Sequence, residues 1–371
     1  MADPRILIVA GEASSDAHGA GLVAALRQGG FTGTFYGVGG PALEAEGVKL
    51  LERYDQLAVV GLVEVLAVLP RAIGLLQRLK GIMAHDPPDL FLPVDSPELN
   101  LRLARSARRR GVPVVYFVAP QVWAWRPRRV RALRRDVSEL LVLFPFEKTW
   151  FEERGVRVTY VGHPFVDAVS ERVARAPRST PTEGLLLPGS RSGEVKRHLP
   201  VMAEAAARVR GSLPSMHWTL RAADRLAADT YEPWAREAGI ALSRRPLVEL
   251  AAAADIAIAA SGTASFEAAI TGTPTIVVYR VNSLTWLLAR RMVTVPHVGM
   301  ANLAAGRSIL PELLQNDCRA GRIAEVAVQL LREKDARERM HRDLLKLRET
   351  FGPPGAYDRA AARVLEAMGE R

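Results

Sequence analysis

The sequence lacks most features that would assign it quickly to a common class. It has a single cysteine, Cys318, in 371 residues, so no intramolecular disulfide can form, and this suits a reducing compartment such as the cytoplasm. Its first residues carry neither the basic start nor the long apolar core of a secretory signal peptide. No G-x-G-x-x-G or G-x-x-x-x-G-K-[ST] spacing occurs, which disfavours nicotinamide chemistry and P-loop ATP hydrolysis.

Metal-ligand sets and a balanced charge are also missing. The seven histidines are scattered, without carboxylate or cysteine partners at ligand spacing, so we expect no metal and no cofactor. A net charge of +10 favours anionic partners, and many of the arginines lie between Arg102 and Arg135. A solvated helix face explains these arginines equally well. Because no recognised binding motif accompanies them, we expect no nucleic-acid partner.

Strand and helix patterns alternate in two successive series. Predicted strands of the first series are Arg5–Ala10, Thr34–Val38, Asp89–Val94, Pro113–Val118, Glu139–Leu143 and Arg157–Val161. Those of the second are Gly184–Leu187, Met216–Arg221, Ile240–Ser243, Asp255–Ala259 and Thr275–Tyr279. Such alternation predicts parallel sheets in two Rossmann-like, doubly wound α/β domains. We predict domains at residues 1–170 and 171–350, joined by a linker at Ser170–Glu183, with a last helix at 354–371 that packs back on the first domain.

The stretch from Asp89 to Asn100 is the most informative in the first half. A buried strand ends at Val94, and Asp95 follows directly before Pro97 and a helical pattern. Asp95 is therefore expected at the carboxyl end of a parallel strand, where open α/β sheets bind ligands. It could accept a proton from a substrate hydroxyl, or it could simply cap the following helix.

Polar side chains follow two other strands of the first half. The segment after the first strand offers Glu12, Ser14 and Asp16, which could cap a helix or bind polar ligand groups. After Val118, the residues Ala119–Arg126 combine Gln121 with two tryptophans. Stacked tryptophans are either core anchors or the lining of a sugar or lipid site, and packing explains Gln121 less easily.

Two loops in the second half have the composition of an anion site. Ser190 and Arg191 lie between a strand and a helix, where exposed N–H groups and one arginine could hold a diphosphate. In the second loop, Ser261, Gly262 and Thr263 again separate a strand from a helix. Each loop alone could be an ordinary turn, and together they predict an anionic nucleotide.

The segment Val59–Met83 is unusually apolar, but charged residues interrupt it too often for a comfortable bilayer span. It reads as a buried kinked helix or as an amphipathic helix lying on a membrane. Within the predicted helix Ser283–Met292, the segment Leu284–Met292, with Trp286 beside Arg290 and Arg291, has a similar character.

Taken in order, these segments resemble the lipid-A-disaccharide synthase family, inverting glycosyltransferases of the double-Rossmann (GT-B) type without a DXD metal motif. The resemblance runs from residue 6 to about residue 310. The matching segments are VAGEASSD, AVVGLVEVL, VDSPELN, APQVWAWR, FPFEK, VGHPF, LPGSR, SGTASFE, VVYR and NLAAGR.

The resemblance implies two domains that face a central cleft, no cofactor and a specific reaction. UDP-2,3-diacylglucosamine would donate its sugar to 2,3-diacylglucosamine 1-phosphate, giving a β-1,6-linked tetraacyl disaccharide 1-phosphate and UDP. Such an enzyme is expected at the cytoplasmic face of the inner membrane of a Gram-negative bacterium, bound peripherally to an anionic surface. A homo-oligomer is left open.

The resemblance also distributes roles among residues. Asp95 would be the catalytic base, with acceptor-side or assisting groups at Glu12, Ser14, Asp16, Asn100 and Gln121. The UDP-binding residues would be Ser190, Arg191, Ser261, Gly262, Thr263, Glu267 at the ribose, Tyr279, Arg280, Asn302 and Arg307. Whether Glu12 assists Asp95 stays open.

Two other functions fit parts of the sequence. A UDP-sugar epimerase would share the double-Rossmann plan, but it would need acid–base pairs around the sugar and would act without an acceptor. A basic nucleic-acid-binding protein would explain the arginines and would bind duplex or RNA without affinity for UDP.

Overall fold

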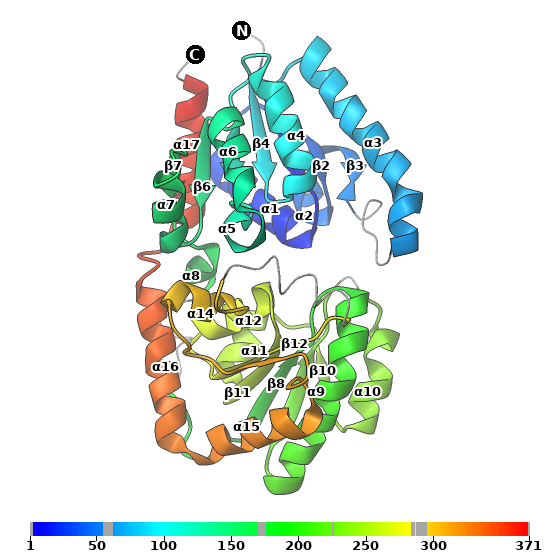
Figure 1. Cartoon of the computed structure of the whole chain (residues 1–371), viewed down its shortest axis with the longest axis vertical. Helices are drawn as coiled ribbons and strands as arrows, with labels where there is room; N and C mark the ends of the chain where they lie inside the picture. The colour runs from blue at the N-terminus through cyan, green and yellow to red at the C-terminus, as the bar shows by residue number, and fades with distance from the viewer. Residues whose placement is uncertain are drawn as a thin grey trace. The chain divides into compact units, whose positions relative to one another are not determined.

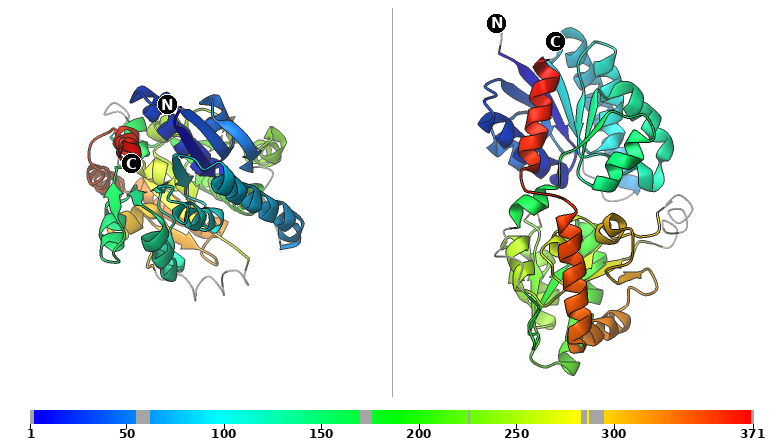
Figure 2. Two further views of the ribbon diagram at one scale, coloured as in Figure 1. Left: turned by 90° about the horizontal axis from the view of Figure 1, so that it is seen from above. Right: turned by 90° about the vertical axis from the view of Figure 1, so that its left-hand side faces the viewer.

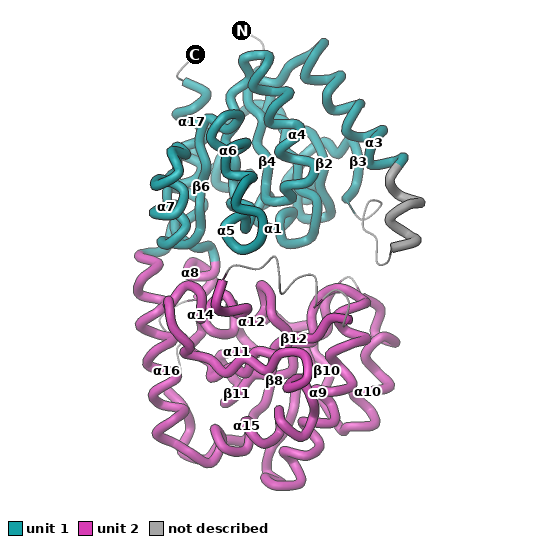
Figure 3. The backbone as a smooth tube through the Cα atoms, in the orientation of Figure 1, with its two compact units in different colours: residues 1–164, 353–371 teal, residues 165–352 magenta. Residues whose placement is uncertain are grey.

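The computed structural model describes residues 3–54, 62–169, 176–224, 226–282, 286 and 295–369, without the side chains of 62–69. The chain forms two compact units (Figure 3). Unit 1 comprises Met1–Pro164 and Pro353–Arg371, and unit 2 comprises Phe165–Gly352. Each unit is an α/β structure with its own parallel sheet, as predicted (Figure 1).

The sheet of unit 1 has the order β3-β2-β1-β4-β5-β6-β7, with parallel neighbours throughout the described residues. The central strands β1 and β4 are almost completely buried because helices cover both faces, which explains their continuous apolar runs. The strands are β1 (Arg5–Ala10), β2 (Thr34–Gly39), β3 (Lys49–Arg53), β4 (Leu90–Val94), β5 (Val115–Phe117), β6 (Glu139–Val142) and β7 (Val158–Tyr160).

The helices of unit 1 connect these strands and cover the sheet. They are α1 (Ala13–Gln28), α2 (Pro41–Ala45), α3 (Leu62–His85), α4 (Pro97–Arg108), α5 (Val122–Trp125), α6 (Val130–Asp136), α7 (Pro145–Glu152) and α17 (Ala356–Gly369). Between α5 and α6 lies a short 3₁₀ helix, η2 (Pro127–Arg129).

The apolar segment Val59–Met83 belongs mainly to α3. Leu75, Leu79 and Met83 recur every four residues and are buried, so the C-terminal half of α3 packs through one stripe. Ile73 lies off this stripe and is 44% exposed. Residues 59–61 and the side chains of residues 62–69 are not among those that the structure describes. No described helix combines the length and apolarity needed to cross a membrane.

The last helix, α17, belongs to unit 1 and packs against α1 (Figure 2). Gly21 on α1 permits this approach, because a Cβ there would lie 2.3 Å from the ring of Tyr357. Arg359 donates to the Val161 carbonyl at 2.8 Å, and Arg363 forms a bidentate pair with the buried Glu139. These partly buried contacts fix the returning segment to the sheet of unit 1.

The sheet of unit 2 has the order β10-β9-β8-β11-β12-β13 and is also parallel. Its strands are β8 (Glu183–Leu187), β9 (His217–Arg221), β10 (Ala241–Ser243), β11 (Ile256–Ala260), β12 (Thr275–Tyr279) and β13 (Glu312–Leu314). Its helices are α8 (Pro164–Ala168), α9 (Ser192–Ser212), η3 (Ala228–Thr230), α10 (Glu232–Glu237), α11 (Leu247–Ala253), α12 (Thr263–Ile270), α14 (Met300–Ala305), α15 (Ala320–Arg332) and α16 (Lys334–Glu349). The predicted helix Ser283–Met292 lies outside the described residues except for Trp286.

Candidate functional site

The strand order reverses at one point in each sheet. In unit 1 the reversal falls between β1 and β4, and in unit 2 between β8 and β11. Open α/β sheets bind ligands at the carboxyl ends of strands beside such a reversal. The segments that begin at Gly11, Asp95, Pro188 and Ser261 follow these four strands, so each unit brings two of the predicted site loops to its reversal point.

The two loops of unit 1 touch each other. The Gly11 N–H donates to Ser96 Oγ at 3.1 Å, and a Cβ at Gly11 would lie 2.5 Å from that oxygen. In the first turn of α1, which follows this loop, Ser14 Oγ donates to Glu12 Oε1 at 3.1 Å. The predicted Glu12 and Ser14 therefore lie directly after Gly11, which contacts the residue following Asp95.

The backbone of Asp95 has an unusual conformation. Asp95 and Ser96 have φ angles of 46° and 49°, and Val118, after the neighbouring strand β5, has 60°. Non-glycine residues adopt this left-handed region at a cost that the surrounding structure must offset, and such residues cluster at functional sites. The N-cap of α4 is Ser96, so the structure does not support the alternative that Asp95 is the capping residue.

Three hydrogen bonds hold the Asp95 backbone. Its N–H donates to the Phe117 carbonyl at 3.1 Å, and its carbonyl accepts from Tyr116 Oη at 2.5 Å and Asn100 Nδ2 at 2.7 Å. Burial of the Tyr116 side chain raises the pKa of its phenol well above the usual value, so the hydroxyl remains a donor. These contacts fix the backbone from which the Asp95 carboxylate extends.

Two predicted acceptor-side residues have a different role. Asn100 is completely buried, and its amide donates to backbone carbonyls, including that of Val9 at 3.1 Å. Asp16 is 2% exposed and accepts from the backbone N–H groups of Gly40 and Ala42 at the start of α2. Both side chains are thus engaged in backbone hydrogen bonds, and their place at the acceptor stays a prediction.

Gln121 is exposed on the segment between β5 and α5, and sequence reasoning missed the residue that holds this segment. Glu147 is 3% exposed and accepts from Trp123 Nε1 at 3.0 Å and from the Phe144 N–H at 3.2 Å. Burial raises the pKa of the Glu147 carboxyl to about 7. The only sign of Glu147 in the sequence was its position in the segment FPFEK, at the start of a helix.

In unit 2, the loop after β8 forms a small anion cradle. Gly189 has a φ of 114°, a conformation that favours glycine. The N–H groups of Ser190 and Arg191 point to Glu194 Oε2 at 3.3 and 3.4 Å, and the Arg191 guanidinium pairs with Glu194 Oε1 at 2.9 Å. A carboxylate of the protein thus occupies the donors that the sequence assigns to a diphosphate.

The second loop of unit 2 leads into α12. Gly262 has a φ of 148°, and Gly262 and Thr263 are exposed at the start of the helix. Ser261 Oγ donates to the Val298 carbonyl at 3.0 Å. One turn further on, Glu267 is partly buried, and burial raises the pKa of its carboxyl to about 7 although Arg221 opposes the shift. The arrangement combines a helix N-terminus with a hydrogen-bond acceptor one turn away.

His198 was missed by sequence reasoning because it looked like one of several scattered histidines. It is 1% exposed on α9, its Nε2 accepts from the Arg280 N–H at 3.1 Å, and its Nδ1 lies 3.4 Å from the Pro188 carbonyl. This pattern requires the proton on Nδ1. Burial lowers the pKa of its imidazole. His198 therefore ties the end of β12 to the anion cradle after β8.

The remaining predicted UDP residues fall into two groups. Tyr279 and Arg280 end β12 beside this histidine, and burial raises the pKa of the Tyr279 phenol. Asn302 is completely buried and accepts from the N–H groups of Ile309 and Leu310 at 2.8 Å, and its place in the UDP site stays a prediction. Arg307 is exposed and pairs with an aspartate of α16 at 2.8 Å.

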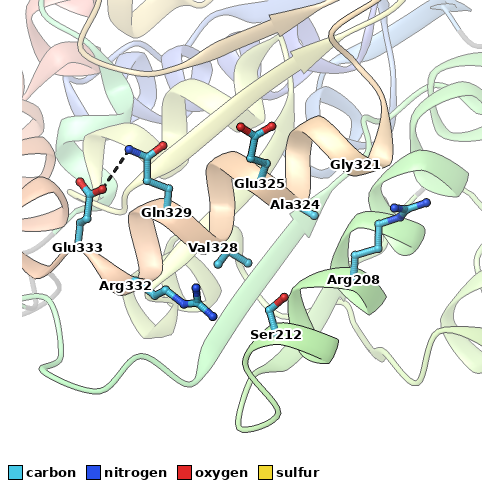
Figure 4. Close-up of a pocket in the computed structure, with 9 residues that line it drawn as sticks. All are labelled: Arg208, Ser212, Gly321, Ala324, Glu325, Val328, Gln329, Arg332 and Glu333. Atoms are coloured by element: carbon cyan, nitrogen blue, oxygen red, sulfur yellow. Dashed lines mark hydrogen bonds between the residues drawn. The ribbon is translucent and has the colours of Figure 1, made fainter.

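A groove of about 500 Å³ on unit 2 is unrelated to these loops (Figure 4). It lies between α15 and the last turns of α9, and Arg208 and Ser212 contribute to its lining. At 1.5 Å per residue, Arg208 is roughly 25 Å along α9 from the cradle at Arg191. Among the described residues, no group of three or more His, Cys, Asp or Glu is placed to hold a metal ion.

Comparison with solved structures identifies the fold. The crystal structure of UDP-GlcNAc 2-epimerase from Neisseria meningitidis bound to UDP-GlcNAc is similar with a TM-score of 0.64 and 13% identity, covering 99% of this chain and 100% of that one. The glycotransferase of kitacinnamycin gives a TM-score of 0.62 and 19% identity, covering 98% and 99%. These likenesses confirm the predicted GT-B fold.

Sequence comparison identifies the family. The family model for lipid-A-disaccharide synthetase matches residues 6–362. The lipid-A-disaccharide synthase of Myxococcus xanthus (strain DK1622) is 41% identical over 376 residues, and that of Syntrophus aciditrophicus (strain SB) is 40% identical over 381 residues, each covering 98% of this chain and 98% of the relative. The resemblance stated from the sequence is confirmed, and the chain belongs to the lipid-A-disaccharide synthase family of glycosyltransferases.

Proposed function

We propose that the protein transfers 2,3-diacylglucosamine from UDP-2,3-diacylglucosamine to 2,3-diacylglucosamine 1-phosphate, with inversion at the anomeric carbon. The family assignment supports the reaction class. The fold alone would fit an epimerase equally well, since one similar structure is an epimerase bound to UDP-GlcNAc. The products of the proposed reaction are a β-1,6-linked tetraacyl disaccharide 1-phosphate and UDP.

In this proposal Asp95 is the general base. The 6-hydroxyl oxygen of the acceptor attacks the anomeric carbon, its proton passes to the Asp95 carboxylate, and the bond from the anomeric carbon to the UDP oxygen breaks. Inversion needs one displacement and no covalent sugar–enzyme intermediate. Base assistance of this kind contributes roughly 10²–10⁴-fold to the rate.

Unit 2 would bind the nucleotide. As the diphosphate leaves it gains negative charge, and N–H groups and a guanidinium aimed at that charge stabilise it without a metal ion. Arg191, the Ser190 N–H and the start of α12 at Thr263 are the proposed donors, with Gly262 allowing close approach. Glu267 would accept a hydrogen bond from the ribose. Ser261, Tyr279, Arg280 and Arg307 complete the proposed nucleotide-binding set.

Unit 1 would hold the acceptor near Glu12, Ser14 and Gln121. Both substrates carry acyl chains, so we propose that the protein works as a peripheral protein at an anionic inner-membrane surface, on its cytoplasmic face. The exposed Ile73 on α3 fits such a surface.

The observation that carries the proposal is the strained Asp95–Ser96 backbone at the β1/β4 reversal. Two contacts hold this conformation: the Asn100 side chain is buried beneath it, and the Tyr116 hydroxyl donates to the Asp95 carbonyl. Strain of about 1–3 kcal/mol per residue persists only where the structure around it compensates. A helix cap would not require this arrangement.

Replacing Asp95 with Asn tests the assignment. The substitution keeps the shape and removes the base, so we expect the single-turnover rate to fall at least ~10²-fold. UDP affinity by calorimetry and the thermal unfolding midpoint should stay unchanged, as controls for the nucleotide site and the fold. A variant with near wild-type turnover would rule out Asp95 as the base.

A further inference from the structure

Two arginines near Asp95 have no role in the chemistry proposed above. Arg126 directly follows α5, and Arg129 is the last residue of η2. Both guanidiniums reach the first turn of α4, where they pair with Glu98 at 3.1 and 2.8 Å. Glu98 lies three residues after Asp95 in the sequence. We call Arg126 and Arg129 the arginine pair.

The indole of Trp125 supports both members of the arginine pair. The guanidinium carbon of Arg126 lies 4.3 Å from the centroid of the Trp125 ring, and that of Arg129 lies 5.6 Å from it. Both distances are within the range of a cation–π interaction. The two tryptophans of this segment therefore differ in role. Trp123 is buried and donates to Glu147, whereas Trp125 is partly buried and holds the arginine pair in place.

The Glu98 carboxylate occupies the arginine pair as a bound anion would. One of its oxygens accepts from both arginines, and the other accepts from Arg129 at 2.8 Å. The Glu98 side chain is 63% exposed, so these ion pairs contribute little to stability. Nη1 of Arg129 is buried and lacks a hydrogen-bond partner among the residues that the structure describes. Because a buried donor without an acceptor is costly, the pair favours an anion with more acceptor oxygens than a carboxylate.

We propose that the arginine pair binds the 1-phosphate of the acceptor sugar. The inference rests on the proposed function, in which unit 1 holds the acceptor with its 6-hydroxyl at Asp95. In that sugar, the phosphate and the carbon that bears the 6-hydroxyl are attached on either side of the ring oxygen. The base and the phosphate site must therefore be separated by a single sugar ring. Asp95 and Glu98, the present partner of the arginine pair, lie on one short segment and meet this requirement.

The chemistry of the arginine pair suits a phosphate. A guanidinium presents a planar fork of donors that matches two phosphate oxygens, and a phosphate carries more negative charge than the carboxylate that it would displace. Burial and the charge of Asp95 raise the pKa of the Tyr116 phenol, and the nearby charge of Arg129 opposes this rise. Because the Tyr116 hydroxyl donates to the Asp95 carbonyl, the phosphate site lies next to the group that holds the base. Binding the phosphate there would orient the 6-hydroxyl toward the carboxylate.

A cycle between the arginine pair and the phosphate tests the proposal, with the full-length protein and both substrates in neutral detergent micelles. Arg126→Gln/Arg129→Gln should lower kcat/KM for 2,3-diacylglucosamine 1-phosphate at least ~10²-fold, mainly by raising the acceptor KM. With the methyl glycoside of 2,3-diacylglucosamine, which lacks the phosphate, this variant and the wild type should react at the same rate. Equal losses with both acceptors, or no loss with the phosphorylated one, would overturn the proposal.

Two further variants separate phosphate recognition from loss of charge and from a structural role. Arg105→Gln/Arg108→Gln removes two exposed arginines of α4 and should keep the wild-type kcat/KM. Glu98→Gln removes the competing carboxylate and should lower the acceptor KM by up to about fivefold, because an exposed ion pair is weak. A structural role of the ion pairs predicts the opposite sign. A higher acceptor KM in Glu98→Gln, or a loss in the α4 variant as large as that of Arg126→Gln/Arg129→Gln, would overturn the proposal.

The remaining measurements distinguish the acceptor phosphate from other lipid phosphates and from the nucleotide. Phosphatidylglycerol added to the micelles should leave the wild-type acceptor KM unchanged. A KM that rises with phosphatidylglycerol in the wild type but not in Arg126→Gln/Arg129→Gln would show a general site for lipid phosphates and overturn the proposal. UDP affinity of that variant should equal that of the wild type by calorimetry, and weaker UDP binding would contradict a site for the acceptor.

Failure of this inference is distinguishable from failure of the proposed function. Absence of disaccharide from the wild type would refute the proposed function and this inference with it. Disaccharide from the wild type, together with an unchanged acceptor KM in Arg126→Gln/Arg129→Gln, would refute the phosphate site alone.

Discussion

The carboxyl edges of the two sheets are built from opposite chemistry on the same topology. At the reversal in unit 1, the left-handed backbone positions are Asp95 and Ser96, and the Glu12 carboxylate accepts from Ser14 on the neighbouring segment. At the reversal in unit 2, the corresponding positions are Gly189 and Gly262, followed by helix N-termini. The edge in unit 1 has strained non-glycine residues and presents a carboxylate. The edge in unit 2 has glycines at these positions, so it is not strained, and it presents N–H donors.

This difference indicates a division of labour. A carboxylate held by a fixed backbone is suited to removing a proton, whereas N–H donors and Arg191 are suited to binding a diphosphate. Glu194 shows that the donors attract an anion, because its carboxylate accepts from them. Breaking one edge should therefore change turnover without UDP affinity, and breaking the other should change UDP affinity first.

The largest effect on the unit 1 edge, apart from that of Asp95, is expected for Gly11→Ala. Its Cβ would lie 2.5 Å from Ser96 Oγ, so the two loops must move apart. Misplacing a catalytic group by about 1 Å can cost ~10²-fold in rate, and we expect a loss of that order in single turnover. Gly81→Ala is the control, since no atom lies within 4 Å of a Cβ there. Similar rates for both variants would contradict the claim that contact between the Gly11 and Ser96 loops positions Asp95.

The unit 2 edge is tested by Arg191→Gln. A hydrogen bond to a charged group contributes about 1.5–3 kcal/mol, so UDP should bind ten- to hundredfold more weakly by calorimetry. Arg208→Gln on α9, the helix that Arg191 precedes, is the control, because Arg208 also pairs with a nearby glutamate, Glu204, at 2.7 Å. Equal UDP affinity of the Arg191 variant and the wild type would show that the cradle is not part of the nucleotide site.

The smallest effect is a pH dependence at Glu267. Burial raises the pKa of this carboxyl from 4.5 to about 7, so the carboxylate, the better acceptor for a ribose hydroxyl, forms as pH rises through neutrality. The ratio of wild-type to Glu267→Gln affinity for UDP should therefore rise by up to about tenfold from about pH 6 to about pH 8. Taking the ratio cancels ionisation of UDP itself. A ratio that is flat or falls with pH would contradict ribose binding by this carboxylate.

The sequence was most informative where burial is complete. The strand predictions Arg5–Ala10 and Asp89–Val94 are confirmed within one residue at each end, because strands covered on both faces require unbroken apolar runs. The edge strands β3 and β13 were missed. They are short, include charged residues such as Lys49 and Glu312, and are only partly buried, so their patterns resemble loops.

Side-chain direction was harder to predict than position. Asp16 and Asn100 follow the expected strand ends and Asn302 lies on α14, yet each is buried and bonded to backbone groups. In the sequence, a polar residue that faces a ligand cannot be told from a polar residue that supports the site through backbone hydrogen bonds. Glu147 and His198 were missed as positioning groups for a related reason, since their partners are backbone atoms or an indole from distant segments.

Product analysis tests the central claim most directly. Purified protein, the two acylated sugars and excess chelator should yield the β-1,6-linked disaccharide 1-phosphate and an equal amount of UDP, and the Asp95→Asn variant should yield at least ~10²-fold less per unit time. Formation of an epimerised UDP-sugar without acceptor, or undiminished disaccharide from the variant, would contradict the account.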